Sequence, residues 1–328
     1  MNGHIATGLL AAGCWLLMSS QSSVLSSQWM LAPRSTLPQL ARQDEPLPVT
    51  AAPVLPQRTQ LFTGQGFDTC EVPTLAALQT WFTASPYRAV NLYIGGAGRY
   101  CTNKKLNAEL VAQLDQIGWK FIPTWVGPQA PCYTNIPTKP KPLMSDDPLV
   151  AYAQGVVEAS AAIKTAIDLG LALPDGSGTI VYYDMEAYAS HVPACDDPVR
   201  AFISGWTEEL HANGNLAGVY GNAHALTGFA AGSNVPDAVW PARWLHTAYD
   251  PAVTVWDVPN LAPTLWAEHQ RIWQYAGGHW EEYGGVRLNI DCDVIDGIVA
   301  TLSPPVLSPR VYLPVVVNAP ENPQGAAK

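Results

Sequence analysis

The sequence predicts a mixed α/β fold, a (β/α)8 barrel of the TIM type, and three observations lead to this prediction. Eight strand candidates alternate with helix candidates along the central part of the chain. They span residues 61–302, and these roughly 240 residues come close to the ~250 of a typical barrel. Acidic residues end several of the strand candidates, and barrels of this type gather their functional groups at the carboxyl ends of their strands.

The elements are expected in strict alternation. The strand candidates are residues 61–68, 89–94, 120–126, 179–184, 217–220, 238–244, 271–275 and 288–292. The helix candidates are residues 75–83, 107–117, 149–171, 198–213, 223–230, 261–269 and 294–302. A doubly wound open sheet is the alternative, and it would carry a glycine-rich phosphate-binding turn after its first strand. The stretch Gly95-Gly96-Ala97-Gly98 follows the second strand instead and lacks the full spacing.

Both ends of the chain are expected to lie outside the barrel, which we place at residues 59–303. An apolar run, short for a membrane span, is followed by small polar residues, so residues 1–27 are predicted to be an export signal. An uncleaved N-terminal anchor is the alternative, because no Lys or Arg precedes the run. Prolines make residues 28–58 an extended linker and residues 304–328 a Pro-rich tail. The protein is therefore expected to be secreted or held at the cell surface.

The composition limits the functions that fit. Of the 328 residues, 48% are hydrophobic and 13% are charged, which is enough for one large core. The formal net charge of −10 disfavours a nucleic-acid partner, since phosphate binding requires clustered Lys and Arg. No cofactor is expected, and membrane association is expected only through the N-terminus. We expect the protein to be a monomer.

Five cysteines lie within the predicted barrel: Cys70, Cys101, Cys132, Cys195 and Cys292. In an oxidising compartment four of them could form two disulfides, and the sequence leaves their pairing open. Cys292 falls inside a strand candidate and is the candidate for a free, buried thiol. No metal site is expected, because the chain has no Cys-x-x-Cys or His-Glu-x-x-His motif and its seven His are scattered.

The segment Ile180-Val181-Tyr182-Tyr183-Asp184-Met185-Glu186 carries the strongest functional signal. An apolar run ends in two carboxylates spaced i and i+2, which point to the same face of an extended strand. Two neighbouring carboxylates cannot both ionise freely, so one can donate a proton while the other stays negative. Glycoside hydrolysis requires such a pair. Two solvated acids at a surface strand end are the alternative.

Further acids end two other strand candidates. Asp68 ends the first, and Asp291 and Asp293 end the eighth. The first and eighth strands are neighbours in a closed barrel, and the fourth lies across its mouth. Together with Asp184 and Glu186, these carboxylates would surround one cavity. For Asp293 the alternative is the N-cap of the last helix candidate.

Several motifs, in this order, resemble a known family. They are Gly66-Phe67-Asp68-Thr69-Cys70, Tyr93-Ile94-Gly95-Gly96, Tyr182-Tyr183-Asp184-Met185-Glu186-Ala187-Tyr188, Gly218-Val219-Tyr220, Gln274-Tyr275 and Asn289-Ile290-Asp291. Over residues 61–302 the chain resembles the glycoside-hydrolase-like barrel domain formerly called domain of unknown function 1906. That domain is in turn similar to the family 25 glycoside hydrolases, the lysozymes of Chalaropsis type.

The resemblance implies a negatively charged groove and catalytic roles for its acids. Glu186 would be the general acid, and Asp184 would stabilise positive charge at the anomeric carbon or orient an acetamido group of the substrate. Asp68 and Asp291 would tune the pKa of Glu186 and bind substrate or water. The residues expected to bind the sugar in the same groove are Tyr93, Trp125, Tyr182, Tyr220, Arg243, Trp244, Trp273, Gln274, Tyr275 and Asp293.

Three functions follow from these observations. Carboxylates at three strand ends favour a secreted glycosidase that cleaves peptidoglycan or another cell-wall or extracellular polysaccharide. A non-catalytic carbohydrate-binding barrel that keeps the groove is the second. A surface module whose barrel only presents its tails is the third, and it would show no affinity for sugars.

Overall fold

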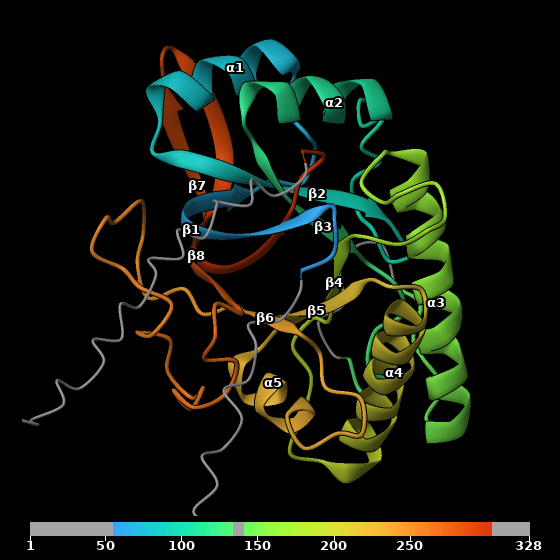
Figure 1. The fold of residues 1–328 in the computed structure, drawn as a ribbon. Helices are drawn as coiled ribbons and strands as arrows, with labels where there is room; N and C mark the ends of the chain where they lie inside the picture. Colours follow the sequence, from blue (N-terminus) through green and yellow to red (C-terminus); the bar gives the residue numbers. More distant parts are fainter. Residues whose placement is uncertain (1–54, 134–140, 304–328) are drawn as a thin grey trace, which may run out of the picture. The chain divides into compact units, whose positions relative to one another are not determined.

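The computed structural model describes residues 55–133 and 141–303, and Figure 1 shows their arrangement. Eight strands hydrogen-bond in sequence order and the eighth pairs with the first, so the sheet closes into a ring. This confirms a mixed α/β fold with an eight-stranded closed sheet. The predicted export signal, most of the predicted linker and the predicted tail lie outside the described residues.

The ring is not built from parallel strands alone. Its strands are β1 (Thr59–Asp68), β2 (Tyr87–Gly95), β3 (Lys120–Trp125), β4 (Ile180–Asp184), β5 (Leu216–Gly221), β6 (Ala238–Pro241), β7 (Arg271–Tyr283) and β8 (Val286–Ala300). Neighbours from β1 to β7 run parallel, whereas β8 runs antiparallel to both β1 and β7. The sheet therefore differs from a regular (β/α)8 barrel, in which all eight strands are parallel.

One helix follows each of the first five strands. These helices are α1 (Leu75–Ala84), α2 (Ala108–Ile117), α3 (Pro148–Asp168), α4 (Pro193–Ala212) and α5 (Ala223–Phe229). Four begin at a side-chain cap, because Thr74, Asn107, Asp147 and Asn222 each accept a hydrogen bond from a backbone N–H of the first turn. α4 starts at Pro193, five residues before the predicted start, with proline at a favourable first position.

Two helix candidates are wrong. Residues 261–269 form turns, and Trp266 and His269 within them adopt positive φ values of 48° and 57°, which a right-handed helix does not allow. Residues 294–302 mostly continue β8, which pairs with β1 over ten residues. Short β-branched apolar runs suit a strand as well as a helix, and here the pairing with β1 decides for the strand.

Two glycines bring α3 and α4 into direct backbone contact. A Cβ atom at Gly155 would lie 2.1 Å from the carbonyl oxygen of Phe202, and one at Gly205 would lie 2.2 Å from the carbonyl oxygen of Tyr152. Both distances are far below van der Waals contact, so a larger side chain would push the two helices apart. The Phe202 ring also packs on Tyr183 with ring centroids 4.9 Å apart, so this helix pair supports β4.

The inside of the ring is filled by side chains. Tyr182 of β4 crosses it, and its hydroxyl donates to the carbonyl oxygen of Ile298 in β8 at 2.7 Å. Gly218 of β5 leaves the room, since a Cβ atom there would lie 2.3 Å from the Tyr182 ring. No helix in either described part of the chain is long and apolar enough to cross a membrane.

The substitution Gly155→Ala should lower the free energy of unfolding by about 1–3 kcal/mol. Overpacking against α4 outweighs the gain of ~1 kcal/mol in helix propensity. Gly228→Ala in α5 is the matched control, because the atoms nearest to its Cβ belong to the flexible side chain of Arg200. Urea unfolding measures the free energy of unfolding of both variants. Equal values for Gly155→Ala and Gly228→Ala would show that α3 and α4 are not in tight contact.

Candidate active site

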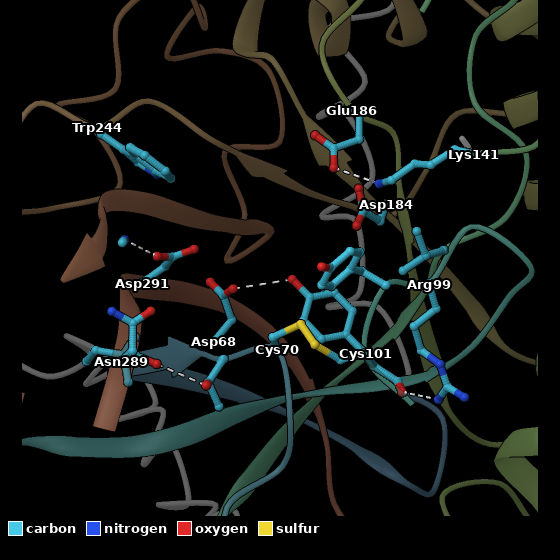
Figure 2. A pocket seen from close by; sticks show the side chains of 16 residues that line it. Asp68, Cys70, Arg99, Cys101, Lys141, Asp184, Glu186, Trp244, Asn289 and Asp291 are labelled. Carbon is cyan, nitrogen blue, oxygen red and sulfur yellow. Dashed lines mark hydrogen bonds and ion pairs between the residues drawn. A yellow bond between two sulfur atoms is a disulfide. The ribbon is translucent and has the colours of Figure 1, made fainter. Parts of the chain in front are cut away.

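A pocket of about 320 Å³ opens where β1, β2 and β4 end, and Figure 2 shows the side chains around it. Its volume falls in the range of sites for small molecules. Six residues predicted from the sequence line it: Asp68, Tyr93, Asp184, Glu186, Trp244 and Asp291. Acidic side chains carried by β1, β4 with its following segment, and β8 therefore reach one pocket.

The two carboxylates spaced i and i+2 do not share one strand. β4 ends at Asp184, and Glu186 lies in the segment that follows. The buried amide of Gln129 donates to the carbonyl oxygen of Asp184 at 2.9 Å and accepts from the backbone N–H of Glu186 at 2.8 Å. The Gln129 side chain thus bonds two backbone groups that would otherwise pair with a neighbouring strand. It holds Asp184 and Glu186 at the pocket.

Asp184 is the carboxyl that can hold a proton near neutral pH. It is only 6% exposed, and its Oδ1 has no hydrogen-bond partner among the described residues. Burial and the nearby charge of Glu186 raise its pKa to about 7, although the positive charge of Lys141 opposes the shift. Asp184 can therefore carry a proton near neutral pH, which is what general acid chemistry at that pH needs.

Lys141 contacts Glu186 directly. Its ammonium lies 2.8 Å from Glu186 Oε1, and the two side chains are 12% and 32% exposed. Burial lowers the pKa of Lys141, but the charges of Asp184 and Glu186 outweigh it and raise that pKa above its usual value. The ammonium therefore stays charged, and Figure 2 shows it beside both acids.

Asp68 and Asp291 form a second acidic pair, opposite each other in β1 and β8. The Gln274 amide donates to both, at 2.7 Å to Asp68 and 3.4 Å to Asp291, and the Tyr93 hydroxyl donates to Asp68 at 3.3 Å. Burial and the charge of Asp291 raise the pKa of Asp68 well above its usual value. Burial also raises the pKa of Asp291. This pair, too, is built to retain a proton.

Gln274 holds these acids from below the pocket. Its side-chain oxygen accepts from the indole N–H of Trp244 at 2.8 Å and from the hydroxyl of Tyr220 at 3.2 Å. Because both donors meet the oxygen, the amide nitrogen must face the carboxyl groups of Asp68 and Asp291. One side chain therefore positions the acidic pair and the Trp244 ring together.

Eight residues expected to bind the sugar do not line the pocket: Trp125, Tyr182, Tyr220, Arg243, Trp273, Gln274, Tyr275 and Asp293. Trp273 and Tyr275 are fully buried, so neither ring has a face open to a ligand. Their polar atoms bond within the fold, Trp273 Nε1 to the Arg243 carbonyl at 3.1 Å and the Tyr275 hydroxyl to Gln65 at 2.9 Å. The pocket instead offers Tyr100 and Trp244, which are 65% and 56% exposed.

Asp293 caps no helix, and neither it nor Asp291 ends a strand. Both lie inside β8, which runs on to Ala300. Asp293 pairs with Gly66, two residues deeper in the ring than the pair of Asp291 with Asp68, and its carboxylate accepts from Trp240 Nε1 at 2.8 Å. Burial, followed by the charge of Asp68, raises the pKa of Asp293 well above its usual value.

The cysteines behave as the sequence predicts, and the structure adds the pairing. Cys70 bonds to Cys101, and Cys132 bonds to Cys195, while Cys292 is free and buried. The first disulfide lines the pocket, where it joins the segments after β1 and β2 (Figure 2). The second ties the segment after β3 to the first turn of α4. Both therefore brace segments at the carboxyl ends of strands.

The sequence did not indicate two residues that organise the site. Lys141 lies in a proline-rich segment 45 residues before Glu186, and Gln129 lies 57 residues before it. Neither sits at a strand end, and no local pattern links them to the acids. Their roles come from the way the segment after β3 folds across the end of β4.

A comparison with protein-family models identifies the family. The model described as "Rv2525c-like, glycoside hydrolase-like domain" matches residues 79–295. The match covers about two thirds of the chain and includes Asp184, Glu186 and Asp291. The chain belongs to the Rv2525c-like, glycoside hydrolase-like family. A search of curated proteins gives no match.

Solved structures of similar fold have low sequence identity to this Rv2525c-like chain. An uncharacterized protein from B. stearothermophilus is 18% identical, covering 70% of this chain and 95% of its own, with a TM-score of 0.42. The catalytic domain of endolysin ply40 from bacteriophage P40 of Listeria monocytogenes is 12% identical, covering 71% and 93%, with a TM-score of 0.41. The Clostridium perfringens spore cortex lytic enzyme SleM is 14% identical, covering 74% and 68%, with a TM-score of 0.43. At these values the likeness supports no inference about activity.

The substitution Asp184→Asn should flatten the dependence of stability on pH. The pKa of Asp184 is about 7 in the folded protein and about 4 in an unfolded chain. The folded state therefore binds more protons between these values, and the unmodified protein should lose up to about 4 kcal/mol of stability as pH rises from about 4 to 7. Urea unfolding across this range measures both proteins. If stability changed with pH in the same way in both proteins, this would contradict a protonated, buried Asp184.

The substitution Lys141→Met should raise the pKa of Asp184 further, by about 1 unit, because it removes the positive charge that opposes the shift. Titration of the Asp carboxyl carbons by NMR follows this change. Lys164→Met is the matched control, since Lys164 pairs with Asp168 on the surface at 2.7 Å, outside the pocket. An Asp184 titration that is the same in both variants would show that Lys141 does not act on it.

Proposed function

We propose that the protein is an O-glycosyl hydrolase whose acid and base groups are Asp184 and Glu186. The observation that carries the proposal is the pocket, in which a buried Asp184 with a pKa of about 7 stands close to a more open carboxyl. Membership of a glycoside hydrolase-like family supports it. Such a pair can supply both the proton for the leaving oxygen and the negative charge that an oxocarbenium-like centre needs.

Glu186 delivers the proton in this mechanism. The proton that Asp184 holds passes to Glu186 before it reaches the leaving oxygen, because the Glu186 side chain is 32% exposed whereas Asp184 is 6% exposed. Glu186 is thus the member of the pair that a substrate oxygen can reach, and Lys141 fixes its position. Once the proton has left, Asp184 carries negative charge next to the positive charge that develops at the anomeric carbon.

The rest of the pocket binds the sugar. Figure 2 shows Trp244 across the pocket from Glu186 and Lys141, with Asp291 and Asp68 lower in the view. An open indole face can stack on the apolar face of a sugar ring. The carboxyl groups of Asp68 and Asp291 can hydrogen-bond to sugar hydroxyls.

We propose a cell-wall or extracellular polysaccharide such as peptidoglycan as the substrate of a secreted, monomeric enzyme. Two disulfides support an oxidising compartment outside the cytoplasm. The negatively charged pocket disfavours polyanionic substrates and suits a glycan whose rings are neutral at the cleaved linkage.

An assay of new reducing ends tests this proposal. Incubation of the full chain with peptidoglycan and a panel of neutral polysaccharides should release reducing ends. Glu186→Gln should lower the rate by at least about 100-fold, the usual contribution of a general acid, while leaving the fold intact by circular dichroism. Glu268→Gln is the matched control, because Glu268 is exposed and lies outside the pocket. Full activity of Glu186→Gln would overturn the assignment.

A carbohydrate-binding barrel without catalysis is the second candidate. The ion pair between Lys141 and Glu186 favours it, because a neutralised pair can hold sugar hydroxyls without transferring a proton. Binding of oligosaccharides to the folded protein with no release of reducing ends from any substrate would decide for this function. Trp244→Ala should then weaken the binding.

A further inference from the structure

A second cluster of polar side chains lies behind the pocket wall, in β7 and β8. It consists of His279 and Glu281 from β7 and Cys292 from β8, and one ligand atom from each lies within 4.8 Å of the others. We propose that these three residues bind a zinc ion. The proposal does not depend on the activity of the pocket.

The distances in the cluster come close to those of a zinc site. Cys292 Sγ lies 3.6 Å from His279 Nε2 and 3.5 Å from Glu281 Oε1. Around tetrahedral zinc, with bonds of about 2.3 Å to sulfur and about 2.0–2.1 Å to nitrogen and oxygen, such pairs lie about 3.6 Å apart. His279 Nε2 and Glu281 Oε1 are hydrogen-bonded at 2.8 Å and need to separate by about half an ångström.

The donor set and its burial suit zinc. Imidazole nitrogen, thiolate sulfur and carboxylate oxygen are its usual protein ligands, and zinc accepts all three in one site. Cys292 is fully buried, while the side chains of His279 and Glu281 are 16% and 9% exposed. The ion can reach the cluster from the side of His279, and the low exposure then shields it from competing water.

Neighbouring groups already orient two of the ligands. The Tyr87 hydroxyl donates to Glu281 Oε2 at 2.8 Å and lies 3.0 Å from Cys292 Sγ, and the backbone N–H of Tyr249 donates to Glu281 Oε1 at 3.0 Å. Such supporting bonds fix the direction of a ligand and raise metal affinity. His279 Nδ1 is buried with no partner among the described residues, so the ring is held only through the cluster.

A bulge in the hairpin creates the cluster. The register of β7 on β8 shifts between Gln274 and His279, and this extra length brings His279 and Glu281 to the side of Cys292. In the same bulge the backbone N–H of Gly278 donates to Asp291 at the pocket. Asp291 and Cys292 are consecutive, so they point to opposite faces of β8. A bound ion would therefore fasten the hairpin segment that holds Asp291.

Binding releases a proton. The Cys292 thiol loses its proton to solvent when the sulfur–zinc bond forms, and the remaining proton of the His279 ring resides on Nδ1 once Nε2 is a ligand. The Glu281 carboxylate binds without losing a proton. A water molecule completes the four ligands, with no change in oxidation state.

Metal titration of the full chain tests the site. All samples carry Cys14→Ser, so that Cys292 is the one thiol outside the disulfides. After treatment with a chelator, the protein should bind one Zn²⁺, and its thermal midpoint should rise with added zinc. Bound Co²⁺ should give a thiolate-to-cobalt charge-transfer band. Cys292→Ser and His279→Ala should each weaken Zn²⁺ binding by about 100-fold or more.

The matched control is His269→Ala, because His269 is an exposed histidine paired with Asp296 and lies outside the cluster. It should bind Zn²⁺ as the Cys14→Ser chain does. Absence of the charge-transfer band from the Cys14→Ser chain would overturn the proposal even if the cluster variants fail to fold. Zinc affinity that is the same in folded Cys292→Ser and in His269→Ala would overturn it as well.

Discussion

The antiparallel course of β8 is the constraint on which the rest of the structure depends. β8 closes the ring by pairing with β1 over ten residues on one side and with β7 on the other. A parallel last strand would bring its carboxyl end to the mouth. The antiparallel strand instead places Asp291, from its middle, opposite Asp68. The chain thus acquires an acidic pair at the mouth and keeps Asp293 as a buried acid deeper in the ring.

The closed ring concentrates negative charge in a place with little water. Burial raises the pKa values of Asp68, Asp184, Asp291 and Asp293, and like charges add to the effect for most of them. Two cations, Lys141 and Arg99, line the pocket together with four acids, and Lys141 contacts Glu186. Repulsion among these carboxyls is therefore reduced when some of them keep their protons. General acid chemistry requires such a protonated carboxyl.

The hairpin of β7 and β8 serves two faces of the protein at once. On the pocket face, Gln274 donates to Asp68 and Asp291 and accepts from Trp244. On the other face, the bulge brings His279 and Glu281 to the free thiol of Cys292. Because successive residues of a strand point to opposite sides, Asp291 faces the pocket while Cys292 faces the cluster. The disulfide between Cys70 and Cys101 links the segments after β1 and β2 at the pocket.

The sequence by itself determined the eight strands, the first five helices, the acids that meet in the pocket and the free cysteine, because these follow from local patterns of apolar and charged residues. Tertiary structure decided the direction of β8, since residues 294–302 suit a helix or a strand until β1 supplies a partner. It also decided that Trp273 and Tyr275 are buried supports, and that Lys141 and Gln129 join Glu186. Those contacts link residues far apart in the chain, and only the closed ring brings them together.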